Sequence, residues 1–205
     1  MLFHSTRGKD SGKDFSAILM QGLADDGGLF MPDHWPQVDL EEIKSKASFI
    51  DIAKCIVPLF TSSSFSYAET IKIVENTWHD FEHPDLVGIQ TLDDVSILEL
   101  FHGPTAAFKD FGLQLAAAFF NEVLESENKT AIVLGATSGD TGSAAIDACK
   151  PYKRIKSFIM LPNGNMSEVQ RRQMSTIDAD NVFALRINGT FDDCQDLVKH
   201  AFKQR

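Results

Sequence analysis

The chain has 205 residues, of which 43% are hydrophobic and 23% charged, proportions typical of a globular domain and unlike those of disordered or fibrous proteins. Its 19 Lys and Arg against 29 Asp and Glu give a net charge of −10, which argues against nucleic acid or a membrane as partner. The three cysteines, Cys55, Cys149 and Cys194, form no C-x-x-C pair, and the first residues lack the pattern of a signal peptide. We therefore expect reduced thiols and a cytoplasmic protein.

Helical segments separated by Gly and Pro occupy the first part of the chain. We predict helices over 15–23, 40–47, 49–59 and 66–81. Ser66 and Glu69 have the spacing of a capping box at the start of the last of these helices. This pattern predicts an α-rich N-terminal domain over residues 1–92.

After Leu92, short β-like runs alternate with helices, which is typical of an α/β fold with a parallel sheet. We predict strands near 95–101, 130–135, 155–161 and 182–187, each followed by a helix. Helices are expected at 107–124, up to Cys149, after Ser167 and after Thr190. The last helix runs to Arg205 with no strand after it, so we expect the domain over 93–205 to be incomplete and the chain to be a fragment.

An apolar strand leads into the loop Gly135-Ala-Thr-Ser-Gly-Asp-Thr-Gly142, which opens a helix. Backbone N–H groups and the positive helix end of such a loop suit a phosphate or a carboxylate. The glycine spacing does not match the dinucleotide pattern, and Asp140 stands where the Walker pattern needs its second glycine. The loop therefore does not favour NAD or ATP as its ligand. The alternative is a tight turn whose hydroxyls only cap the helix.

Lys109 lies between Phe108 and Phe111 at the predicted start of a helix. Apolar neighbours and the positive helix end both disfavour the ammonium form, and a neutral amine is able to attack a carbonyl or accept a proton. The alternative is that Lys109 extends to solvent from an amphipathic helix whose phenylalanines pack inward. The residues alone leave both interpretations open.

Two segments carry a specific resemblance. Phe101-His-Gly-Pro-Thr-Ala-Ala-Phe-Lys-Asp-Phe-Gly112 and Gly135-Ala-Thr-Ser-Gly-Asp-Thr-Gly142 resemble the signature segments of threonine synthases. The similarity to that family extends to four further segments and so covers nearly the whole chain. These segments are residues 5–8, 22–32, 170–174 and 188–198.

The resemblance implies the fold of type-II pyridoxal-phosphate enzymes, which is similar to that of the tryptophan synthase β subunit. It implies pyridoxal phosphate bound to Lys109 as a Schiff base, with Phe108 and Asp140 also in contact with the cofactor. The substrate carboxylate would be bound by a loop that comprises Thr137, Ser138, Gly139, Asp140 and Thr141. Asp140 replaces the Asn of many type-II enzymes, as in the longer microbial and fungal threonine synthases.

The implied reaction converts O-phosphohomoserine and water to threonine and phosphate. The family's loop for the cofactor phosphate lies beyond the end of this chain, so we expect weak cofactor binding and little turnover by the chain alone. Alternative functions are a threonine or serine dehydratase, a β-replacement enzyme, or a non-catalytic anion-binding relative. The sequence leaves a monomer and a homodimer equally open.

Two further motifs carry weaker signals. His79-Asp-Phe-Glu-His83 matches an inverted zinc-protease motif, but Pro84 disfavours helical geometry at His83 and no distant acidic ligand can be named, so we expect no metal. Arg171 and Arg172 either attract a phosphorylated substrate or form a solvated face.

Overall fold

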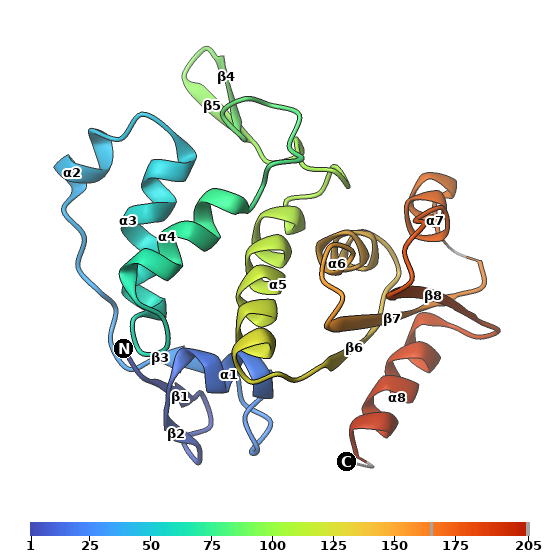
Figure 1. Ribbon diagram of the computed structural model, residues 1–205. Coiled ribbons are helices and arrows are strands. Elements are labelled where there is room, and N and C mark those ends of the chain that lie inside the picture. Colours follow the sequence, from blue (N-terminus) through green and yellow to red (C-terminus); the bar gives the residue numbers. More distant parts are fainter. Residues whose placement is uncertain (165, 204–205) are drawn as a thin grey trace. The chain divides into compact units, whose positions relative to one another are not determined.

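The computed structural model describes residues 1–164 and 166–203 (Figure 1). The chain divides into two compact units, Met1–His79 and Asp80–Arg205. The domain boundary near Leu92 that the sequence suggests remains a prediction. The expected end of the last helix, at Arg205, lies outside the described residues.

The first unit combines four helices with a small sheet. The helices are α1 (Phe15–Gln21), α2 (Leu40–Lys44), α3 (Phe49–Thr61) and α4 (Tyr67–Asn76). The strands β1 (Phe3–Ser5), β2 (Ser11–Lys13) and β3 (Phe30–Pro32) form an antiparallel sheet in the order β2-β1-β3. The predicted helices are confirmed, although the last ends at Asn76. The three short strands were not predicted.

Helix α4 begins where its local sequence directs. The Ser66 hydroxyl accepts from the Glu69 N–H, and the Glu69 carboxylate accepts from the Ser66 N–H at 2.8 Å, so the predicted capping box is confirmed. Buried hydroxyls of Thr61 and Thr70 bond each other at 2.9 Å and join α4 to α3. Val74 of α4 is fully buried in this unit.

The second unit alternates strands and helices around a parallel sheet. Strands β6 (Ala131–Ala136), β7 (Ile155–Pro162) and β8 (Val182–Ile187) pair in the order β6-β7-β8. Helices α6 (Asp140–Cys149), α7 (Glu168–Ser175) and α8 (Phe191–Phe202) follow these strands, and α5 (Lys109–Ser126) precedes them. Helices α6 and α7 lie on one side of the sheet and α8 on the other (Figure 1). The predicted α/β class is confirmed.

The central strand β7 explains why this unit holds together. Ile155, Ile159 and Leu161 are buried at odd-numbered positions of the strand, so they point to the same face of the sheet, which is covered by the core. Ile159 packs with Ile146 of α6 and Met174 of α7 in one hydrophobic cluster. Helices α6 and α7 are therefore anchored to the same core on β7.

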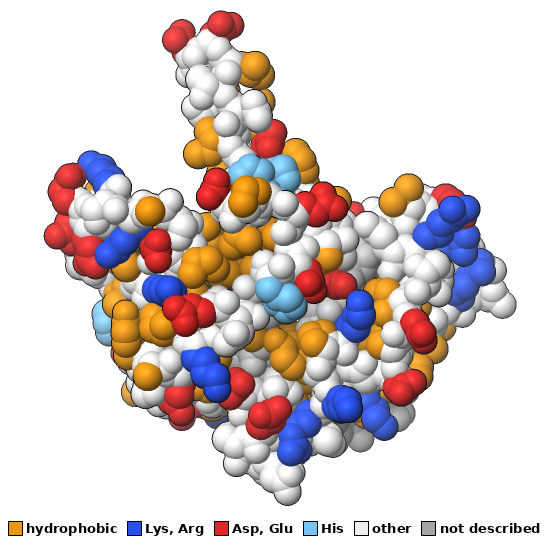
Figure 2. All heavy atoms as spheres, turned by 45° about the horizontal axis from the view of Figure 1, so that its top comes forward, with side chains coloured by type: hydrophobic (Ala, Val, Ile, Leu, Met, Phe, Trp, Pro, Cys, Tyr) orange, Lys and Arg blue, Asp and Glu red, His pale blue; other side chains and the backbone are white. Residues whose placement is uncertain are grey.

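The strand and the helix of the first predicted unit are both present, but the expected place of that strand in the parallel sheet is wrong. Residues Val95–Glu99 form β5, which pairs antiparallel with β4 (Gly88–Leu92) in a separate hairpin. The reason is the two-residue turn Asp93-Asp94, in which Asp93 adopts φ 50° and reverses the chain. Ile89 and Val95 are 65% and 62% exposed, and Figure 2 shows this hairpin with an acidic tip and hydrophobic sides.

No helix in the described part of the chain combines the length and apolar character needed to cross a membrane.

Candidate functional site

The structure brings Lys109 and Asp140 together. Lys109 is the first residue of α5 and Asp140 the first residue of α6, two helices that pack against each other. The Lys109 Nζ lies 4.0 Å from Asp140 Oδ2 and 4.7 Å from the centre of the Phe108 ring. The Lys109 side chain is 30% exposed and that of Asp140 is 52% exposed, so both are open to small molecules. The expectation for Lys109 considered apolar neighbours and the positive helix end, whereas the structure adds a carboxylate.

The turn between β6 and α6 is organised by Thr137. Its buried hydroxyl accepts from the N–H groups of Gly139 and Gly142, at 3.1 and 3.0 Å. The hydroxyl of Thr137 therefore caps N–H groups of the turn, which is the structural role that the sequence left open as an alternative. Ser138 and Thr141 are exposed at the start of α6, where the first N–H groups of a helix have no intrahelical acceptor. The turn thus keeps a surface on which an anion can bind.

Two glycines of this turn allow helix α7 to approach closely. A Cβ on Gly139 would lie 2.9 Å from Gln170 Nε2, and a Cβ on Gly142 would lie 2.8 Å from Met174 Sδ and 2.9 Å from Thr137 Cβ. These contacts are shorter than van der Waals packing permits. The glycines therefore serve the close packing between α6 and α7.

The backbone around Lys109 is held by a buried carboxylate. Asp110 is fully buried and accepts from the Thr105 N–H at 2.9 Å and the Thr105 hydroxyl at 2.6 Å. A Cβ on Gly103 would lie 2.7 Å from Asp110 Cβ, so this glycine makes room for the carboxylate. Between them Ala106 adopts φ 56°, the left-handed region that non-glycine residues rarely occupy. This strained turn fixes where α5 begins.

Helix α7 supplies two side chains that our sequence reasoning did not assign to the site. Gln170 Nε2 donates to Asp140 Oδ1 at 2.6 Å, and Gln173 Nε2 donates to the backbone oxygen of Thr105 at 3.0 Å. The two glutamines are three positions apart in the sequence, which places them on one face of the helix. This spacing lies within residues 170–174, a segment that already resembled the family. It was the signal from which the two glutamines could have been assigned to the site.

The basic pair on α7 is engaged within its own helix. Arg172 Nε lies 2.9 Å from Glu168 Oε1, and Arg171 also pairs with Glu168. Hydrogen bonds from Arg171 and Arg172 lower the pKa of the Glu168 carboxyl from 4.5 to about 2. Part of the positive charge is therefore neutralised locally, and this favours a solvated face over a dedicated phosphate clamp.

The inverted zinc-protease motif does not form a cluster of ligands. Across residues 1–164 and 166–203, no three His, Cys, Asp or Glu side chains are grouped so that they could hold a metal. His83 instead packs its ring on that of His102, with centroids 4.8 Å apart, and His102 bonds Glu99 at 2.9 Å.

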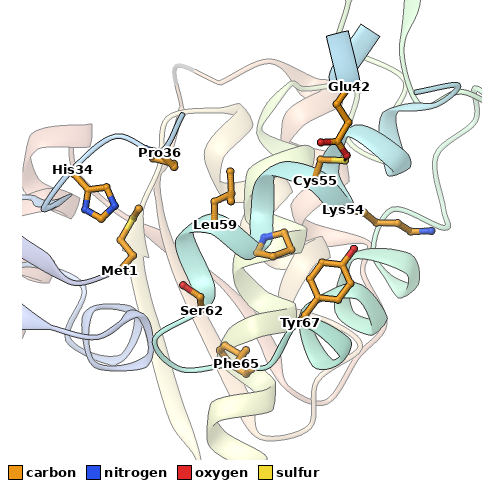
Figure 3. A pocket seen from close by; sticks show the side chains of 11 residues that line it. Met1, His34, Pro36, Glu42, Lys54, Cys55, Leu59, Ser62, Phe65 and Tyr67 are labelled. Carbon is orange, nitrogen blue, oxygen red and sulfur yellow. The ribbon is translucent and has the colours of Figure 1, made fainter. Parts of the chain in front are cut away.

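A separate groove lies in the first unit (Figure 3). It contains none of the predicted site residues. Cys55 lies in it, with its Sγ 3.9 Å from Glu42 Oε1, and its other lining residues are Met1, His34, Pro36, Lys54, Pro58, Leu59, Ser62, Phe65 and Tyr67.

Comparison with known families matches both units. Residues 91–205 match the family described as pyridoxal-phosphate dependent enzyme, and residues 2–78 match the family described as threonine synthase N terminus. The threonine synthase of Pseudomonas aeruginosa is 43% identical over 98% of this chain and 44% of its own length. That of Schizosaccharomyces pombe is 43% identical over 97% of this chain and 41% of its own length.

Solved structures agree with these relatives. The pyridoxal-phosphate-bound threonine synthase of Brucella melitensis has a TM-score of 0.92 and 42% identity, covering 99% of this chain and 44% of that one. The yeast threonine synthase has a TM-score of 0.91 and 38% identity, covering 100% of this chain and 44% of that one. The predicted resemblance and type-II fold are confirmed. The chain spans less than half the length of the relatives it matches.

Proposed function

We propose, since this chain belongs to the family of pyridoxal-phosphate-dependent enzymes, that it supplies the lysine-bearing part of a threonine synthase site. The observation that carries the proposal is the approach of Lys109 Nζ to Asp140 Oδ2, at 4.0 Å, because it joins the two segments that resemble the family signatures. The proposed reaction is carbon–oxygen lyase chemistry on O-phosphohomoserine, with water added to give threonine and phosphate.

The residues at this site fit pyridoxal phosphate. A primary amine that is 30% exposed is accessible to an aldehyde, and the Phe108 ring beside it offers an apolar face. When bound, the cofactor supplies an electron sink for charge that develops at the substrate Cα. Lys109 would hold the cofactor covalently through Nζ, with Phe108 and Asp140 in contact with it.

The amine of Lys109 would also take and return protons at the substrate carbon atoms. Asp140 would hold that amine near one place through its Oδ2. A carboxylate of the substrate would bind at the start of α6, where Ser138, Gly139 and Thr141 lie beside N–H groups without intrahelical acceptors. Thr137 would contribute by fixing this turn, because its hydroxyl already bonds two of its N–H groups.

Three further expectations belong to this proposal. The partner is a small anionic substrate rather than a macromolecule, and the protein acts as a monomer or homodimer. We propose a cytoplasmic location because Cys55, Cys149 and Cys194 are free thiols.

Trapping of the cofactor tests the proposal. The chain is incubated with pyridoxal phosphate, reduced with borohydride and mapped by peptide mass spectrometry. We expect the label at Lys109, its loss in Lys109→Arg, and little label at the exposed Lys129. Equal labelling of Lys109 and Lys129 would contradict the proposal.

The substrate class is tested in the same samples. O-phosphohomoserine should protect Lys109 from labelling, whereas serine and threonine should not. Protection by serine or threonine alone would favour a dehydratase or a β-replacement enzyme. Phosphate release is measured in parallel, and we expect little turnover by this chain alone.

A further inference from the structure

Helix α7 contacts both loops that surround Lys109. Gln170 donates to Asp140 Oδ1 at 2.6 Å, while Gln173 donates to the Thr105 backbone oxygen at 3.0 Å. Thr105 in turn bonds Asp110, the residue after Lys109. One helix therefore ties down the residues on either side of the amine.

We propose that Gln170 is a positioning residue that acts on Lys109 through Asp140. A carboxylate is planar, so holding Oδ1 fixes the direction in which Oδ2 points. Oδ2 is the atom that lies 4.0 Å from Lys109 Nζ. This inference rests on the proposed function of Lys109 and adds a residue to it.

An ordering partner matters because Asp140 stands on the surface. Its side chain is 52% exposed, and an exposed carboxylate at a helix start loses rotamer freedom only if another group holds it. The pair with Lys109 alone is too long and too exposed to do so strongly. The 2.6 Å bond from Gln170 is the shorter contact and is the one that sets the carboxylate orientation.

Gln170 is itself held from several sides. Its amide oxygen accepts from the Ser167 hydroxyl at 3.0 Å, which leaves the amide nitrogen directed to Asp140. Gly139 has no Cβ, and a Cβ there would lie 2.9 Å from Gln170 Nε2. A Cβ at position 139 would therefore push the amide away from its present position against the carboxylate.

A neutral donor suits this position better than a cation. An arginine or lysine in place of Gln170 would compete with Lys109 for the carboxylate and repel its ammonium form. The neighbouring Arg171 and Arg172 are both paired with Glu168. The amide orients Asp140 without adding charge beside Lys109.

A merely structural role for Gln170 would fasten α7 to α6 with no consequence specific to Lys109. The two roles differ in their dependence on Asp140. A positioning role requires the carboxylate, so removing the amide should have no further effect once Asp140 has become Asn. A structural role predicts effects that add.

The test compares the parent chain with Gln170→Leu, Asp140→Asn and the double variant. Gln195→Leu on α8 is the matched control, since it makes the same chemical change in a helix on the other side of the sheet. The measured quantity is the pyridoxal phosphate concentration that gives half-maximal borohydride-trapped label at Lys109. We expect about a tenfold increase for Gln170→Leu, in the range for losing a hydrogen bond to a charged group, no change for Gln195→Leu, and equal values for the double variant and Asp140→Asn.

A second readout needs no cofactor. In chains with 13Cε-labelled lysine, with Lys109 assigned from Lys109→Arg, the Lys109 resonance should move in Gln170→Leu but not between Asp140→Asn and the double variant. An unmoved Lys109 resonance, or effects of the two substitutions that add, would overturn the role of Gln170. Absence of label at Lys109 in the parent chain, with the resonance shifting as expected, would instead overturn the proposed function alone.

Discussion

The carboxylate of Asp110 accepts two hydrogen bonds from Thr105, at 2.9 Å from its N–H and 2.6 Å from its hydroxyl. Both residues are buried, so their hydrogen-bonding groups are shielded from bulk water. We expect Asp110→Ala to lower the free energy of unfolding by about 2–4 kcal/mol, because a buried N–H and a buried hydroxyl lose their acceptor. Urea denaturation measures this change. The control Asp94→Ala, at the exposed hairpin tip, should stay close to the parent, and equal midpoints for both variants would contradict the assignment.

The second prediction compares two glycines of the same unit. Gly142→Ala places a Cβ 2.8 Å from Met174 Sδ, and we expect it to cost about 1–3 kcal/mol of unfolding free energy, as for overpacked cores. Gly112 lies inside α5, where a Cβ would meet no heavy atom within 4 Å, so Gly112→Ala should instead stabilise by about 0.5–1 kcal/mol. Thermal unfolding of the two variants separates these outcomes, and a stabilising Gly142→Ala would show that α7 does not pack on this turn as described.

Local signals in the sequence predicted much of the fold. Strand β8 has the predicted bounds, and α8 begins after Thr190, because the Thr190 hydroxyl caps the N–H of Asp193 within the same short segment. Pairing between distant residues was not predictable in this way. The run that forms β5 has the same composition whether its partner is parallel or antiparallel, so its place in a hairpin was missed.

In the candidate site, too, local sequence signals were predictive and contacts between distant residues were not. Lys109 and the turn at 137–142 stood out because their residue types carry chemistry in a recognisable order. Gln170 did not, because its contact with Asp140 joins positions 30 residues apart and depends on how α7 packs against α6. Such contacts follow from tertiary packing, which one sequence does not specify.

The third prediction concerns acid pH and Glu168. Hydrogen bonds from Arg171 and Arg172 lower the pKa of its carboxyl from 4.5 in the unfolded chain to about 2 in the folded one. A lowered folded pKa contributes stability that is present above pH 4.5 and lost as the pH falls towards 2. Carboxyl resonances followed by NMR should show Glu168 titrating near the lower value.

The free energy of unfolding, measured as a function of pH, tests the same direction of change. The difference in unfolding free energy between the parent and Glu168→Gln should be present at neutral pH and disappear as the pH falls through this window. The control Glu122→Gln, at an exposed position of α5, should follow the parent at every pH. A difference between parent and Glu168→Gln that does not change with pH would contradict the ion-pair network.

The last prediction concerns the reactivity of the three thiols. Burial raises the pKa of the Cys149 thiol from 9.0 to about 11, and burial also raises the pKa of Cys194. Because the thiolate is the reactive form, only about one Cys149 in a thousand is reactive at pH 8, and its burial blocks access as well. Cys55 lies in the groove of the first unit (Figure 3), where a reagent can reach it. With a disulfide reagent at pH 8 we expect one fast phase, mapped by mass spectrometry to Cys55 and abolished by Cys55→Ser. Cys149 and Cys194 should react only after denaturation, and a fast reaction of Cys149 in the folded chain would show that β7 and α6 do not enclose it.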